Sequence, residues 1–225
     1  MTASSAELSL EDFAAQLLQG RPYVLIAVDG QGGSGKSTLA EHLVHAAGAG
    51  CVISMDEFYR PSADRDALRA QEPIPPAPFF DSERLREQVL EPLRRGAAAT
   101  WQTYDWDADC LGPARTTTPQ GLLVIEGVSA FRQGLAGFYD ASIWVECSYN
   151  LRLARGVARD GEAARDTWVH EWIPEEDRYR LAEQPDARAA YVVDGAGDAL
   201  TRASVRVLRQ PARDEGTEIG HTRNE

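Results

Sequence analysis

The chain has 225 residues and a formal net charge of −12 at pH 7. A chain of this length can bury one sizeable core, so we expect a single domain. The acidic balance argues against a nucleic-acid partner, because surfaces that bind nucleic acid cluster lysine and arginine. No apolar run approaches the roughly 18 residues of a membrane span, and the first residues lack the basic start and apolar run of a signal peptide. We therefore expect a small-molecule ligand and no membrane association.

Three cysteines lie far apart in the chain, at Cys51, Cys110 and Cys147. Their spacing matches no metal site, and an odd, scattered set is typical of reduced thiols. This pattern predicts a cytoplasmic protein.

The first part of the chain predicts a helix, a strand and a second helix. Residues 8–18 place apolar side chains at helical intervals, with Ser9 as N-cap and Gly20 as the stop. Residues 23–28 form an apolar, β-branched run of strand length, and residues 38–47 return to helical spacing.

Between that strand and the second helix, residues 30–37 match the phosphate-loop pattern of Gly, four residues, Gly, Lys and then Ser or Thr. The glycines allow backbone N–H groups to turn inward around an anion, while the following helix adds the positive end of its dipole. Lys36 is the only lysine of the chain and can reach the β- and γ-phosphates, whereas the Ser37 hydroxyl can ligate Mg²⁺. The expected phosphate-binding residues are Gly30, Gly32, Gly33, Ser34, Gly35, Lys36, Ser37 and Thr38.

A second short strand is predicted over residues 51–55 and leads into Asp56. In an open parallel sheet the ligand crevice lies beyond the carboxyl ends of the strands, so Asp56 would face the same crevice as the phosphate loop. We interpret Asp56 as the candidate general base. The alternative, that Asp56 merely caps the next helix, stays open.

Residues 60–80 are predicted to be loop-like, because the prolines at 73, 75, 76 and 78 interrupt helices and favour extended backbone. A helix is expected from residue 81 to about residue 96, followed by a strand-like arm over residues 99–105. Tyr104 near the end of this arm would either stack on a planar substrate or bury a hairpin.

The best-defined buried strand is a continuous apolar run over residues 121–125 that ends at Glu126. Nucleotide-transferring folds place at this position the acid that organises the magnesium shell. A further strand is predicted over residues 141–145.

The next predicted helix, over residues 149–160, carries Arg152, Arg155 and Arg159 on one face. An arginine face beside a nucleotide site suggests a lid that grips the transferred phosphate, and a merely solvated face is the alternative. Helical spacing continues over residues 163–181, and residues 189–193 read as a last core strand. Residues 210–225 are polar and predicted to be disordered.

The alternation of strands and helices predicts an α/β fold, a parallel sheet of about five strands with helices on both faces. Residues 1–209 would form the single domain, with the lid at about residues 149–170.

Taken together, the motifs resemble the uridine kinase and phosphoribulokinase family of P-loop kinases. The resemblance covers about residues 23–194 and rests on the phosphate loop, the Asp-Glu-Phe-Tyr-Arg stretch at 56–60, Phe80-Asp81, Tyr104-Asp105, Glu126-Gly127 with Phe131, and the arginine-rich segment from Arg152 to Asp160. It implies a three-layer P-loop kinase fold, use of ATP and Mg²⁺, and an acceptor-side insertion at about residues 60–118.

The resemblance also implies roles for individual residues. It implies Asp56 as the base that accepts the proton of the acceptor hydroxyl, Asp81, Tyr59 and Tyr104 as acceptor contacts, Glu126 with Ser37 in the magnesium shell, and Lys36, Arg155 and Arg159 as catalytic cations. The family often forms dimers or tetramers, so a homo-oligomer is compatible with it.

The chain departs from uridine kinases where those enzymes carry a basic stretch that contacts the pyrimidine. Here the sequence after Trp106 reads Asp107-Ala108-Asp109, which removes the evidence for a uracil pocket. We therefore expect a small-molecule kinase acting on a nucleoside-like or sugar-like acceptor. A kinase for a pantothenate-type alcohol and a regulatory ATPase without an acceptor are the alternatives.

Overall fold

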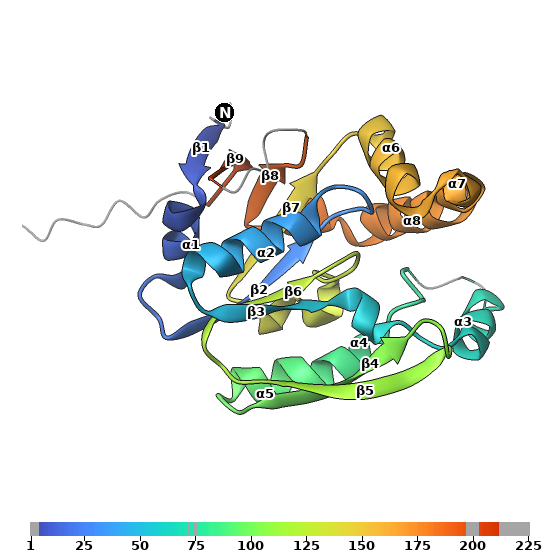
Figure 1. Ribbon diagram of the computed structural model, residues 1–225, viewed down its shortest axis with the longest axis horizontal. Coiled ribbons are helices and arrows are strands. Elements are labelled where there is room, and N and C mark those ends of the chain that lie inside the picture. Colours follow the sequence, from blue (N-terminus) through green and yellow to red (C-terminus); the bar gives the residue numbers. More distant parts are fainter. Residues whose placement is uncertain (1–4, 72, 74–75, 197–202, 212–225) are drawn as a thin grey trace, which may run out of the picture.

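The computed structural model describes residues 5–71, 73, 76–196 and 203–211. Its centre is a seven-stranded sheet in the order β1-β9-β8-β7-β2-β6-β3 (Figure 1). Five neighbouring strands run parallel: β8 (Tyr191–Asp194), β7 (Ala141–Glu146), β2 (Tyr23–Asp29), β6 (Gly121–Glu126) and β3 (Gly50–Ser54). The prediction of an α/β fold with about five parallel strands is confirmed.

Two antiparallel strands at one edge of the sheet were not predicted. Strand β9 (Ser204–Arg209) pairs with β8, and β1 (Ala6–Ser9) pairs with β9. The expected first helix therefore begins later, as α1 (Leu10–Leu18), although Ser9 caps it as predicted by accepting a hydrogen bond from Asp12 N at 3.0 Å. A four-residue strand whose partner lies about 200 residues away leaves too little local pattern to be recognised.

Alternate residues of β2 face the two layers that cover the sheet. Val24, Ile26 and Val28 belong to the core beneath α1 and α2 (Lys36–Ala47), whereas Leu25 and Ala27 belong to the core on the opposite face. Figure 1 shows α1 and α2 above the sheet and α4 and α5 below it. Every residue of β6 is buried, as expected for a central strand covered on both sides.

The lower layer contains one continuous helix and a hairpin. The helix runs through α4 (Ser82–Leu85), the π turn η2 (Arg86–Leu90) and α5 (Glu91–Arg94), which confirms the expected helix in this region. Strand β4 (Ala99–Asp105) lies where the sequence predicted it and pairs with the unpredicted β5 (Cys110–Thr117).

One prediction for the segment 60–80 is wrong, because it contains helix α3 (Ser62–Arg69). This helix begins after Pro61 and ends before the run of prolines that starts at residue 73, so no proline interrupts it. It buries none of its residues, so no buried apolar face marks it in the sequence. The 3-10 turn η1 (Met55–Phe58) precedes it and carries Asp56.

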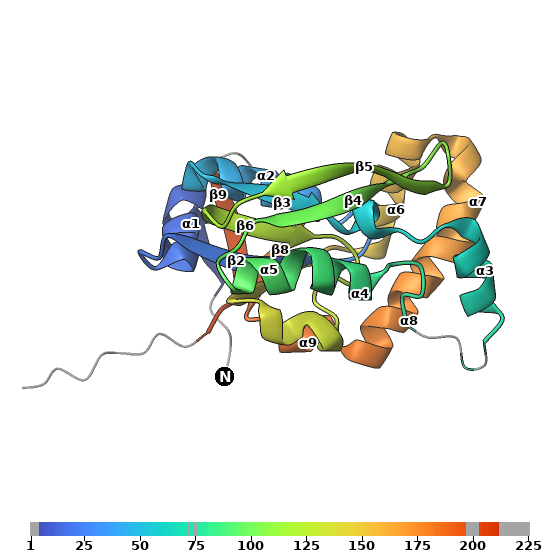
Figure 2. The ribbon, with the colours of Figure 1, turned by 90° about the horizontal axis from the view of Figure 1, so that it is seen from below.

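The helices after β7 are α6 (Tyr149–Asp160), η4 (Glu162–Ala164), α7 (Arg165–Thr167), the π turn η5 (Trp168–Trp172), α8 (Ile173–Glu183) and α9 (Pro185–Arg188). Of these, α6, α7 and α8 lie at the end of the molecule that also carries α3, whereas α9 lies beside β7 below the sheet (Figures 1 and 2). The turn η3 (Gln133–Phe138) lies between β6 and β7. Among the residues that the structure describes, no helix is both long and apolar enough to cross a bilayer. The predicted disorder of residues 210–225 falls almost entirely on residues 212–225, outside the described part.

Gly121 opens β6 in the left-handed region, with φ of 60°. A Cβ at this position would lie 2.2 Å from the carbonyl oxygen of Ala49. We expect Gly121→Ala to lower the free energy of unfolding by about 2 kcal/mol or more, because it combines backbone strain with a clash against main chain. Urea unfolding followed by circular dichroism measures the change.

Gly134→Ala is the matched control, because a Cβ at Gly134 would meet no atom within 4 Å. The control should unfold close to wild type. Equal midpoints for the two variants would contradict the packing described for the start of β6.

Candidate active site

A cavity of about 320 Å³ opens at the end of the sheet where the parallel strands terminate. Its phosphate-loop side is lined by Gly32 and Lys36. The opposite side contributes Asp56, Tyr59, Phe79, Phe80 and Trp106, and the segment from α6 to α8 contributes Arg159, Asp160, Trp168, Trp172, Glu175 and Glu176. A cavity of this size, with aromatic walls and a few charged groups, is typical of small-molecule sites.

The phosphate loop is packed tightly against α6. Gly33 has φ of 75°, and a Cβ there would lie 2.4 Å from the backbone oxygen of Arg152. Gly35 is also left-handed, with φ of 96°, and precedes the first helical residue, Lys36. Only glycine permits this backbone path, so the loop can present its N–H groups and the start of α2 to an anion.

Ser37, the residue after Lys36, forms a hydrogen bond with Glu126. The Ser37 hydroxyl donates to Glu126 Oε2 at 3.0 Å, and the Glu126 carboxylate is buried at the end of β6. Within the described part of the chain, no group of three or more His, Cys, Asp and Glu could hold a metal by itself. One hydroxyl and one carboxylate fit Mg²⁺, because this ion keeps several waters and also binds substrate phosphates.

Asp56 lines the cavity from the turn after β3. Its backbone N–H donates to Ser54 Oγ at 3.2 Å, which fixes the start of the turn. Arg84 holds the turn from below by donating to the Glu57 carbonyl oxygen at 3.0 Å and by placing its guanidinium 4.8 Å from the Phe58 ring. The Asp56 carboxylate is thus exposed at a defined place in the cavity wall.

Of the three predicted acceptor contacts, the structure brings only Tyr59 to the cavity wall. Its ring stacks on Trp106 with centroids 4.6 Å apart. Tyr104 is buried behind Tyr59, with centroids 5.7 Å apart, and its hydroxyl donates to Asp109. Asp81 caps α4 by accepting from Arg84 N at 3.2 Å and pairs with Arg60 at 3.1 Å.

The three arginines predicted on one helix face point to different surroundings. Arg159 lines the cavity, where its guanidinium makes two hydrogen bonds to Asp160, of 2.7 and 3.0 Å. Arg155 donates to the carbonyl oxygens of Gly195 at 2.7 Å and Gly33 at 3.3 Å, outside the residues that line the cavity. Arg152 is buried.

Sequence reasoning missed two buried carboxylates beside the loop. Glu176 on α8 lies against Gly32 and lines the cavity, and burial raises its pKa to about 7. Asp29, the last residue of β2, accepts hydrogen bonds from Gly30 N at 2.7 Å, Phe131 N at 2.9 Å and Tyr179 Oη at 2.6 Å. Burial raises the pKa of Asp29 to about 6, although these donors favour its ionised form. Asp29 could have been suspected from its place before the loop, whereas no motif marks Glu176.

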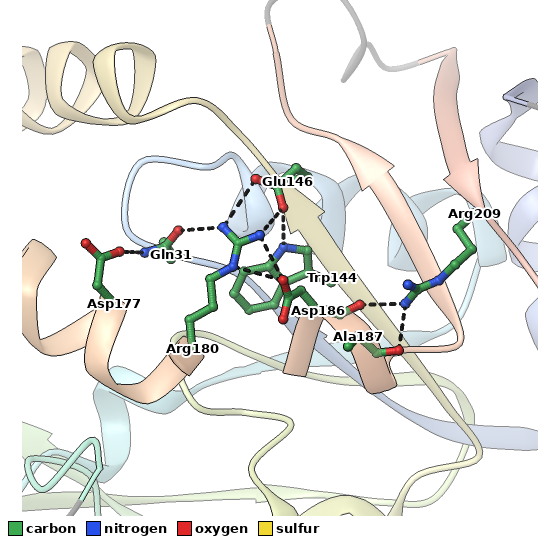
Figure 3. Close-up of polar contacts among 8 residues, drawn as sticks. All are labelled: Gln31, Trp144, Glu146, Asp177, Arg180, Asp186, Ala187 and Arg209. Carbon is green, nitrogen blue, oxygen red and sulfur yellow. Dashed lines mark hydrogen bonds and ion pairs between the residues drawn. The ribbon is translucent and has the colours of Figure 1, made fainter. Parts of the chain in front are cut away.

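Arg180 anchors α8 to the end of β7 (Figure 3). It donates to Glu146 Oε2 at 2.8 Å and to Asp186 Oδ2 at 3.0 Å, and it reaches Gln31 of the phosphate loop at 3.4 Å. Helix α8 is therefore fixed to both the sheet and the loop, and it closes one side of the cavity.

The sequence and the fold were compared with known proteins. The sequence model of the phosphoribulokinase / uridine kinase family matches residues 25–167. A uridine kinase of Brevibacillus brevis is 29% identical over 151 residues, which are 64% of this chain and 68% of the relative. An inorganic pyrophosphatase of Arabidopsis thaliana is 26% identical over 179 residues, and the match covers 76% of this chain but only 24% of that protein.

Two solved structures share the fold. A protein described as a possible uridine kinase from Bacillus stearothermophilus superposes with a TM-score of 0.63 and 23% identity, covering 81% of this chain and 96% of that one. A candidate fructose transport system kinase from Silicibacter sp. TM1040 gives a TM-score of 0.64 and 21% identity, covering 78% and 96%. At these identities the structures establish the P-loop kinase fold, and the matched family model, which spans more than half of the sequence, shows that the chain belongs to the phosphoribulokinase and uridine kinase family.

Proposed function

We propose that the chain is an ATP-dependent kinase that transfers the γ-phosphoryl group to a hydroxyl of a neutral, nucleoside-like or sugar-like alcohol. The observation that carries this proposal is that Lys36 of the phosphate loop and the exposed carboxylate of Asp56 line one cavity. A cavity lined in this way would offer a site for the donor phosphates and a base for the acceptor within reach of one bound pair of substrates.

The donor side follows from the loop and its neighbours. Backbone N–H groups of the loop and the Lys36 ammonium would hold the β- and γ-phosphates. Ser37 and Glu126 would hold Mg²⁺, which when bound neutralises the charge that develops on the transferred group.

On the acceptor side, Asp56 would orient the acceptor hydroxyl and accept its proton. Phosphoryl transfer needs an aligned hydroxyl more than covalent help from the protein, so one positioned carboxylate is sufficient. Tyr59 and Trp106 offer a stacked aromatic wall against which the ring of an acceptor can pack.

The charges of the cavity favour an acceptor without a negative charge. Among the described residues that line it, the cations are Lys36, assigned to the donor, and Arg159, already bonded twice to Asp160. Arg60, close to the acceptor wall, is paired with Asp81 at 3.1 Å. A carboxylate or phosphate on the acceptor would meet Asp56 without a cation to offset it. A pantothenate-type acceptor, which carries a carboxylate, is therefore the second candidate.

The lid would complete the site by excluding water, because an open site would waste ATP by hydrolysis. We propose that residues 1–209 act as one kinase domain and that residues 60–118 form its acceptor side. The contacts of α8 with the loop extend the proposed lid beyond residue 170.

Lys36→Ala and Asp56→Asn should each lower acceptor-dependent ATP consumption by at least about 10²-fold, because each removes a group assigned to the transfer step. Coupled assays with and without a mixture of nucleosides and sugars measure this, and circular dichroism checks that the fold is kept. Asp56→Asn also tests the regulatory-ATPase alternative, in which hydrolysis without an acceptor would survive this change.

Asp64→Asn is the control for these variants, because Asp64 is an exposed acid on α3. It should retain wild-type turnover. Near-normal turnover of Asp56→Asn would refute the role assigned to that carboxylate.

Arg159→Ala should slow turnover while ATP still binds, because the guanidinium lies in the cavity on the lid rather than on the phosphate loop. Steady-state kinetics beside a direct ATP-binding measurement separate the two effects. An unchanged rate would mean that Arg159 belongs to a solvated helix face.

A further inference from the structure

Glu176 of α8 binds a backbone N–H group of the phosphate loop, and the transfer reaction does not explain this contact. Its Oε2 accepts a hydrogen bond from Gly32 N at 3.0 Å. The loop N–H groups are the feature that binds phosphate in sites of this type, so an acidic side chain stands where an anionic ligand would bind. Glu176 is 9% exposed and lines the same cavity as Lys36.

The surroundings of the Glu176 carboxylate contain cations. The Arg152 guanidinium lies 3.3 Å from the same Oε2 atom, and both side chains are buried. The positive charges of Lys36 and Arg152 favour the ionised form of Glu176 and act against the burial that raises its pKa. A backbone N–H, an ammonium and a guanidinium around one anion form the kind of environment that a nucleotide phosphate requires.

Neighbouring residues of α8 hold Glu176 against the loop. Asp177 Oδ1 accepts from Gln31 Nε2 at 2.5 Å, and the Tyr179 hydroxyl donates to Asp29 at 2.6 Å. Gln31 lies between Asp177 and Arg180 (Figure 3). The contact between Glu176 and Gly32 is thus one of several contacts that α8 makes with the loop and the end of β2. While the Glu176 carboxylate stays at Gly32, the loop has no space for an additional anion there.

We propose that the Glu176 carboxylate in its ionised form is an internal competitor of the nucleotide, and that it must leave Gly32 before a terminal phosphate can bind there. This inference rests on the proposed nucleotide site. On binding, the phosphate would replace the carboxylate at the Gly32 N–H and as the partner of Arg152. Glu176 therefore sets the affinity for ATP and links nucleotide binding to the position of α8.

Glu176→Gln tests the competition, because it keeps the size of the side chain and removes its charge. We expect the Kd for ATP with Mg²⁺ to fall on the order of tenfold, the effect of losing one charge-assisted hydrogen bond from the competitor. Inorganic tripolyphosphate is the second probe, and its Kd should fall by a similar factor because the competition involves phosphate alone. Titration calorimetry measures both without turnover.

Glu176→Asp is the second variant, in case removal of the charge leaves Arg152 unpaired and the protein unstable. It keeps the charge but shortens the side chain, so it should release Gly32 and tighten ATP binding severalfold. Glu11→Gln is the control, since it makes the same substitution at an exposed position of α1, and it should bind ATP within twofold of wild type.

A purely structural pair between Glu176 and Arg152 gives a different result. ATP affinity would then be unchanged or weaker in folded Glu176→Gln and Glu176→Asp, and either result would overturn the inference. Failure of the proposed function is distinguishable, because wild type and all variants would then bind neither ATP nor tripolyphosphate.

Discussion

The close packing of the phosphate loop against helices α6 and α8 and the turn η5 is the constraint on which the rest of the site depends. The loop passes so near α6 that a Cβ on Gly33 would lie 2.4 Å from a backbone oxygen of Arg152. Gly32 is crowded in the same way by Trp168 and Glu176. Glycine at these positions therefore serves two purposes, since it shapes the loop and lets α6, η5 and α8 pack directly against it. Helix α8, held in this place, closes one side of the cavity.

Two walls of different origin meet across this cavity. The donor wall is built by the central strands β2 and β6, whose ends carry the loop and Glu126. The wall that we assign to the acceptor is built by Asp56 and Tyr59, by Phe79 and Phe80, and by Trp106 in the turn of the β4–β5 hairpin. Arg84 of α4 supports this wall from outside the cavity through the Glu57 carbonyl oxygen and the Phe58 ring. Asp56 lines the cavity between these two walls, so under the proposed function the end of the sheet would hold the phosphates and the second layer would determine which alcohol reaches Asp56.

Elements with strong local patterns were predictable, and those defined by distant partners were not. The apolar runs of β2 and β6 and the glycine-rich loop located the phosphate site directly. In contrast, β1 and β9 are short and depend on each other across the whole chain, and α3 has no buried face. The surroundings of Tyr104 and Arg155 could not be read from spacing, because their polar groups bond to Asp109 and to the carbonyl oxygen of Gly195, which lie elsewhere in the sequence or in an irregular segment. Glu176 escaped notice because only the fold brings α8 to Gly32.

The most direct test of the central claim is ATP consumption by the purified protein with Mg²⁺ against matched acceptors, with the mass of the product determined. Neutral nucleosides and sugars are compared with pantothenate and with phosphorylated sugars. We expect a neutral alcohol to stimulate turnover and to gain the mass of one phosphoryl group. Stimulation by the anionic acceptors alone, or ATP hydrolysis that no acceptor alters, would contradict the account.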